Sequence, residues 1–224
     1  MSQIISVSRR TDIPAFYRKW FMNRLNEGFA GYVNPYSGQK YLISLKPEDV
    51  LCFVFWSKNY APFLDKLKAI EAMGYQFYFN YTITGLSHIF ERRVNQLEYA
   101  LDTLKRLSDS YSPTHINWRY DPILISNITP YDFHLKTFET IASKLDGYVE
   151  RCYFSYAVQY GKVKRHFSQL QSDSDITVLE PDVKFKVKLA NQLASVGWVE
   201  VRNPPFINKN VGCSETPTHP TFAN

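Results

Sequence analysis

The sequence predicts an α/β fold, namely a partial or complete (β/α) barrel-like domain with mainly parallel strands and an inserted β-hairpin. Three observations support this. Six short apolar runs, rich in β-branched or aromatic residues, are spaced along the 224 residues, and most precede a segment with helical periodicity. Alternation of strand and helix favours parallel strands joined by right-handed crossovers. One pair of strand-like segments is separated only by a turn-rich hexapeptide, which is typical of a hairpin.

The first β-α unit and the hairpin follow each other at the start of the chain. The apolar residues 4–8 predict a strand, and Asp12 can cap a helix that ends near Gly28. Residues 29–33 and 40–45 then flank the hexapeptide NPYSGQ. We expect them to form a hairpin, which could act as a flap.

The same signals predict the remaining units. Strands are expected at residues 50–56, 76–83, 116–120, 151–156 and 198–201, and helices at residues 61–73, 91–107, 129–145 and 182–196. Residues 157–181 are less regular and predict an excursion with a basic patch at Lys162, Lys164, Arg165 and His166. We therefore predict one barrel-like domain over residues 1–203 and an irregular tail over residues 204–224, which has four prolines.

Six units suit a partial barrel, because a complete eight-fold barrel usually needs about 250 residues. A doubly wound open sheet remains an alternative. The sequence contains no GxGxxG or GxxxxGK[ST] element, which weakens the nucleotide-binding form of that alternative.

Composition narrows the class of protein. Lys and Arg total 26 against 21 for Asp and Glu, and this excess permits an anionic small molecule or nucleic acid as partner. The three cysteines are far apart and odd in number, which argues against a disulfide framework and favours a reducing compartment. No run of about 18 apolar residues could cross a bilayer, and the first residues do not resemble a secretion signal. We therefore expect a cytoplasmic protein without a membrane partner.

Polar residues follow most of the predicted strands, where ligands bind in both architectures. Cations there could surround a phosphate or carboxylate, and the carboxylates could act as general base, as metal ligand or as partner of an arginine. The predicted catalytic residues are Asp12, Asp121 and Lys58, and the predicted substrate-binding residues are Arg9, Arg10, Thr11, Trp56, Asn59, Arg119 and Tyr120. We assign no residue to a metal.

Each of these residues also has a purely structural interpretation. An Arg–Asp pair at a strand end often holds a loop, and Asp12 has a sufficient role as a helix cap. Arg119 and Asp121 are two residues apart and point to the same side if the strand continues that far. The five histidines show no HxH or HExxH spacing, which gives little support to a histidine metal site.

Three segments carry a family resemblance: SRRTDIPAFY at residues 8–17, LKPEDVLCFVFWSKN at residues 45–59 and INWRYDPIL at residues 116–124. In order and spacing they resemble a bacterial family called domain-of-unknown-function family 1848. The likeness covers about residues 4–156 and implies a barrel-like α/β fold, but it implies no established activity.

The resemblance also implies a carboxyl-terminal cysteine cluster of the kind that holds an iron–sulfur centre. In this chain the tail reads VGCSETPTHPTFAN, and Cys213 is its only thiol. We therefore expect no iron–sulfur cluster from the cysteines of this chain, and the cofactor is left open. Three hypotheses remain: an enzyme acting on an anionic, phosphate-bearing substrate; a non-catalytic module that binds nucleic acid or protein; and a relative of iron–sulfur radical enzymes that lacks the cluster.

Overall fold

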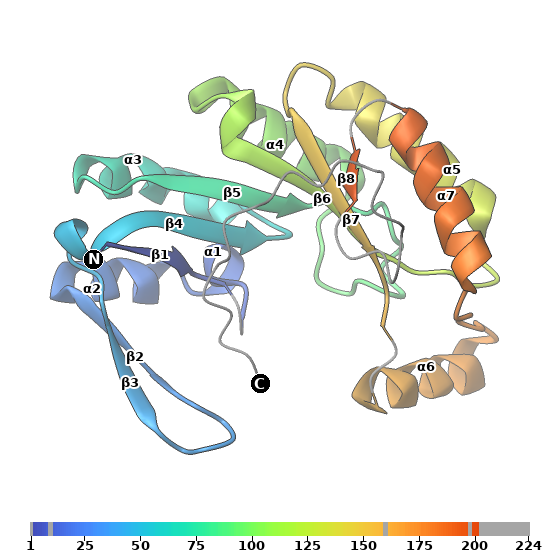
Figure 1. Ribbon diagram of the computed structural model, residues 1–224, viewed down its shortest axis with the longest axis horizontal. Helices are drawn as coiled ribbons and strands as arrows, with labels where there is room; N and C mark the ends of the chain where they lie inside the picture. The colour runs from blue at the N-terminus through green and yellow to red at the C-terminus, as the bar shows by residue number, and fades with distance from the viewer. Residues whose placement is uncertain (1, 9–10, 159–160, 197–198, 202–224) are drawn as a thin grey trace.

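The computed structural model describes residues 2–8, 11–158, 161–196 and 199–201, with only the backbone at residues 162 and 199–201. Within this part of the chain, six parallel strands form one sheet that curls as half of a barrel (Figure 1). In spatial order they are β1 (Gln3–Ser6), β4 (Val50–Ser57), β5 (Phe77–Thr82), β6 (Ile116–Ile123), β7 (Arg151–Tyr156) and β8 (Val199–Val201).

The strand order confirms the barrel-like prediction and excludes the doubly wound alternative. Each strand pairs in parallel with the next strand of this sheet along the sequence, and the order never reverses. A doubly wound sheet instead has a switch point where the order reverses. The described sheet does not close, since β1 and β8 are its edges.

Helices connect the strands. They are α1 (Ile13–Phe16), α2 (Arg18–Glu27), α3 (Leu64–Ala72), α4 (Leu97–Ser110), α5 (Tyr131–Lys144), α6 (Gly161–Ser174) and α7 (Val183–Ser195), with 3-10 turns η1 (Pro47–Asp49), η2 (Ala61–Phe63) and η3 (Pro113–His115). Asp12 and Asp182 cap α1 and α7, each accepting a backbone hydrogen bond in the first turn, as predicted for both helix starts.

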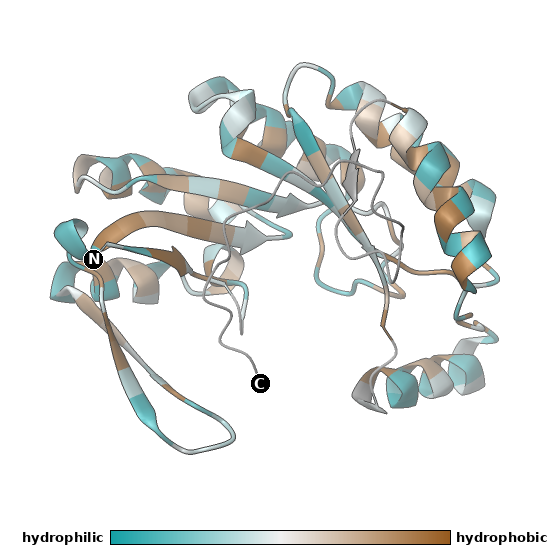
Figure 2. Ribbon diagram, in the orientation of Figure 1, coloured by the Kyte–Doolittle hydropathy of each residue, from teal (hydrophilic) through white to brown (hydrophobic). Residues whose placement is uncertain are grey.

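The core lies between the helices and one face of the sheet. Alternate side chains of the strands point to this face, and Figure 2 shows β4 as hydrophobic along most of its length. Phe21 of α2 contacts Phe53 and Phe55 of β4 edge-on, with ring centroids 5.4 and 5.6 Å apart. Trp118 of β6 stacks on Phe138 of α5 at 4.8 Å. The opposite face of the sheet, which we call the inner face, is therefore left for other uses.

Two predictions about helices were wrong. The helix predicted at 91–107 is α4, which begins only at Leu97; the preceding residues form a loop, in which Glu91 pairs with Lys58 of another unit. The excursion predicted at 157–181 contains the helix α6. Val163, Phe167 and Leu170 form its apolar stripe at helical spacing, which the surrounding polar residues concealed.

The hairpin consists of β2 (Phe29–Val33) and β3 (Lys40–Ser44), as predicted. Its base lies at the amino end of the sheet, because the Leu45 carbonyl, five residues before β4, accepts a hydrogen bond from the hydroxyl of Tyr75, two residues before β5. From there the hairpin projects away from the sheet (Figure 1), and its role as a flap stays a prediction.

Residues 204–224 of the predicted tail lie outside the described residues, as do Arg9, Arg10 and Cys213. Among the described residues, no helix is long and apolar enough to span a membrane.

Candidate functional site

The inner face of the half-barrel is polar toward the carboxyl ends of the strands. Since side chains alternate, every second residue of each strand points to this face. The register aligns them in rows: Trp56 lies beside Asn80 and Asn117, and Thr82 lies beside Arg119 and Tyr153. This face does not pack against the helices; Trp56 and Arg119 on it are partly exposed, whereas Asn80 and Asn117 are buried.

The most organised group of this face is centred on Arg119. Its guanidinium lies over the Trp56 ring, 4.3 Å from the ring centroid, and its Nη2 forms an ion pair with Asp121. The other carboxylate oxygen of Asp121 accepts a hydrogen bond from the hydroxyl of Ser155 on β7. The side chains of Arg119 and Asp121 are 13% and 22% exposed, so both are reachable yet largely shielded from water. Strand β6 extends to Ile123, which is why the two side chains point to the same side.

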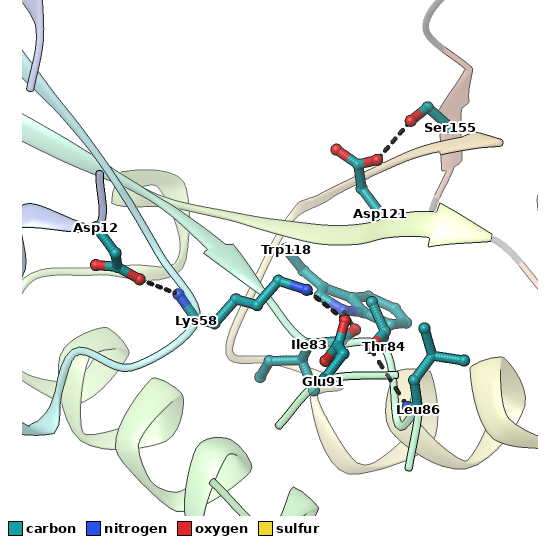
Figure 3. A network of polar contacts seen from close by, with 9 residues as sticks. All are labelled: Asp12, Lys58, Ile83, Thr84, Leu86, Glu91, Trp118, Asp121 and Ser155. Atoms are coloured by element: carbon teal, nitrogen blue, oxygen red, sulfur yellow. Dashed lines mark hydrogen bonds and ion pairs between the residues drawn. The ribbon is translucent and has the colours of Figure 1, made fainter. Parts of the chain in front are cut away.

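Asp12 joins two elements at the carboxyl end of β4. Its Oδ1 accepts from the Ala15 backbone N–H at 3.0 Å, and its Oδ2 accepts from the Ser57 hydroxyl at 2.9 Å and the Lys58 backbone N–H at 3.1 Å. Both oxygens of the carboxylate therefore hold the chain in place. Figure 3 shows Asp12 and Asp121 well apart, on different strand ends.

Lys58 extends its side chain away from Asp12 toward the loop between β5 and α4 (Figure 3). There its ammonium pairs with Glu91. Glu91 is only 8% exposed, whereas Lys58 is 33% exposed. The pair holds this loop against the carboxyl end of β4 and leaves the Lys58 side chain partly exposed.

Several buried polar atoms on or beside the inner face have no hydrogen-bond partner within the described part of the chain. They are the Trp56 Nε1, the Ser8 Oγ and the Asn117 Oδ1. The Asn117 amide donates to the Asn80 Oδ1 at 3.3 Å, which leaves its own oxygen unpaired. Buried polar atoms in native proteins nearly always have partners, so unpaired ones indicate a bound molecule or water.

The structure brings together only part of the predicted site. Trp56, Arg119 and Asp121 form one group, and Lys58 lies at the same end of the sheet. Tyr120 points instead to the helix side, where it is fully buried and its hydroxyl bonds to the Nδ1 of His134 at 2.9 Å. Alternation along β6 requires this, because its neighbours Arg119 and Asp121 face inward.

Two further predicted residues, Thr11 and Asn59, do not join the Arg119 group. Thr11 is exposed, and the Asn59 side chain accepts from the Ala61 backbone N–H at 3.1 Å. Sequence reasoning missed Glu91, for which no signal exists, and the pair Asn80 and Asn117. Asparagines at inward positions of otherwise apolar strands were the signal for that pair.

Two buried titratable groups next to this region, His134 and Cys152, lie on the helix side. Burial lowers the pKa of His134 and raises that of the Cys152 thiol, so the imidazole is neutral and the thiol is protonated at neutral pH. Burial also raises the pKa of Cys52, which lies on the inner face. Over the described residues, no three His, Cys, Asp or Glu side chains gather as a metal site.

Fold and site together define an open (β/α) half-barrel protein with a polar group at the carboxyl end of its inner face. The chain belongs to the family described as Domain of unknown function (DUF1848), whose model matches residues 4–201. This match confirms the resemblance seen in the sequence. No curated protein matches the chain.

Proposed function

We propose that the chain is an enzyme acting on an anionic, phosphate-bearing substrate, which it binds on the inner face at Arg119. The observation that supports this most is that two hydrogen-bond donor groups, the Arg119 guanidinium and the Trp56 indole, lie next to each other. A guanidinium that uses Nη2 for Asp121 lies over an indole whose buried N–H has no acceptor among the described residues. A phosphate supplies an acceptor for the indole N–H and for the guanidinium N–H groups that Asp121 does not use, because the planar fork of an arginine can donate to two phosphate oxygens at once.

Asp121 supplies the acid–base chemistry in this proposal. Its carboxylate is oriented by Arg119 and by the Ser155 hydroxyl, and a carboxylate held in this way can take a proton from a substrate hydroxyl or water. Lys58 provides a second cation, whose ammonium has three donors and whose side chain is partly exposed. Arg9 and Arg10, which lie outside the described residues, remain candidates for the same anion.

The experiment measures binding of inorganic phosphate, pyrophosphate and a panel of phosphomonoesters by NMR, following the indole N–H signal of Trp56. The wild-type protein should show a saturable shift, and Arg119→Gln should weaken binding by roughly 10- to 100-fold, as expected for a charged hydrogen bond. Arg106→Gln, at an exposed position of α4, is the matched control. Absence of a saturable shift, or equal binding by Arg119→Gln, would contradict the proposal.

Turnover distinguishes an enzyme from a binding protein. For any bound phosphomonoester that is converted, Asp121→Asn should lower kcat by roughly 10²- to 10⁴-fold while the folded variant still binds the ligand. Unchanged kcat would remove Asp121 from the chemistry.

A second candidate function rests on α6. The helix carries Lys164 and Arg165 in its first turns, both exposed and, within the described residues, without an ion-pair partner. Cations are unfavourable near a helix amino terminus, so a partner with phosphate groups would stabilise them. If the chain is a nucleic-acid-binding module, Lys164→Ala/Arg165→Ala should reduce the salt dependence of binding by about two phosphate contacts, and Arg119→Gln should change nothing.

A further inference from the structure

A hollow of about 520 Å³ lies at the carboxyl end of β4 and β5, outside the Arg119 group. It is lined by Asn59, Ala61, Pro62, Asn95, Gln96 and Tyr99. The first three come from the end of β4 and from η2, and the last three from the end of the β5–α4 loop and the first turn of α4. Its size lies within the range of small-molecule sites in proteins.

Asn59 and Asn95 of this hollow each have an NH₂ group without an acceptor within the described part of the chain. The Asn59 oxygen accepts from the Ala61 backbone N–H at 3.1 Å, which turns its NH₂ group away from that bond. The Asn95 Nδ2 is buried and has no acceptor within the described part of the chain. Gln96 occupies the N-cap position of α4, but its side chain makes no capping hydrogen bond. A buried amide without an acceptor is costly, so the hollow suits a ligand that brings one.

The other lining groups favour a neutral ligand with an apolar face. Among the described residues, no charged side chain lines the hollow, and the nearby Glu98 in the first turn of α4 is paired with Lys144. Tyr99 is 51% exposed and, with Pro62, offers apolar surface beside the amides. Amides that pair with hydroxyl groups, next to an aromatic ring that packs against C–H groups, match the two kinds of surface on a sugar ring.

We propose that this hollow is a binding site for a neutral sugar residue, held by the amides of Asn59 and Asn95 and packed against Tyr99. Asn59, which the sequence predicted to bind substrate, binds the sugar through its NH₂ group. The site does not depend on the anion site, because it consists of different side chains. The two proposals therefore fail separately.

The test uses saturation-transfer NMR on the full chain with methyl glycosides of glucose, galactose and N-acetylglucosamine. At least one should bind saturably with a Kd of roughly 1–10 mM, a weak affinity suited to a few hydrogen bonds at an open site. Asn95→Ala and Tyr99→Ala should each weaken that binding about fivefold or more. The matched controls are Asn191→Ala on α7 and Tyr36→Ala on the hairpin, both at exposed positions, and they should bind as the wild type does.

A stability measurement keeps the test decisive. Because Asn95 has an unpaired buried amide in the free protein, Asn95→Ala should be at least as stable as the wild type, so loss of binding cannot be ascribed to unfolding. Three results would overturn the proposal: no saturable binding of any glycoside, unchanged binding by both variants, or loss of glycoside binding in Arg119→Gln.

Discussion

Replacing Asp12 by alanine should destabilise the protein far more than removal of an ordinary helix cap. The substitution removes one capping bond to Ala15, which is worth about 1 kcal/mol. It also removes the bonds from the Ser57 hydroxyl and the Lys58 backbone N–H to a carboxylate, together worth about 3 kcal/mol. The expected loss of unfolding free energy is therefore about 4 kcal/mol, a large part of the total of roughly 5–15 kcal/mol for a domain.

The assay is equilibrium urea unfolding, with Asp182→Ala as the matched control. Asp182 caps α7 through one bond from the Phe185 N–H at 2.7 Å, and within the described part of the chain its side chain makes no other hydrogen bond or ion pair, so its removal should cost about 1 kcal/mol. The difference of about 3 kcal/mol isolates the bonds that tie β1–α1 to the end of β4. Equal destabilisation by the two variants would refute this reasoning, and the case for a catalytic role of Asp12 would then be open again.

Three further outcomes are expected. Burial lowers the pKa of His134, so the unfolded chain takes up the proton first on acidification, and wild-type stability should fall as the pH drops below about 6.5. In urea unfolding, the stability of His134→Gln should fall less between about pH 7.5 and about pH 5.5 than that of the wild type. Lys58→Met should cost about 2 kcal/mol because it leaves the buried Glu91 carboxylate unpaired, and the double variant Lys58→Met/Glu91→Gln should recover most of this loss; an additive double variant would show that the pair contributes nothing. Gly85→Ala should lower the unfolding free energy by about 2 kcal/mol, because Gly85 has φ +65° and an added Cβ would lie 2.5 Å from Thr137 Cγ2. In thermal or urea unfolding, adding Thr137→Ser should restore part of the lost stability; no recovery would mean that the backbone angle alone is responsible.

The fold could be predicted from the sequence because its signals are local. Asp12 and Asp182 precede helices that they cap, Gly28 ends α2 in the left-handed conformation, and β7 has the predicted bounds of 151–156. The loop before α4 could not be predicted in this way, because it contains Glu91, whose partner Lys58 is 33 residues away in sequence. A local pattern carries no information on such a tertiary partner.

The candidate site could be predicted only as a set of strand ends. Parallel strands bring their carboxyl ends to one edge, which places Trp56 and Arg119 together although 62 residues separate them in the chain. The register of each strand decides which of its side chains face inward. In β6 it places Arg119 on the inner face and Tyr120 against α5. Ser155 completes the group from a strand whose polar residues gave no specific signal.

The closed base of the hairpin has a practical consequence for protein engineering. The Leu45 N–H donates to the Gly28 carbonyl at 2.8 Å, so the chain enters and leaves the hairpin at nearly the same point. Its tip, where Tyr36 is 86% exposed, projects away from the sheet (Figure 1). A fluorescent protein or affinity tag inserted at residues 35–38 would thus add mass to the molecule without crossing the sheet, its core or the strand ends.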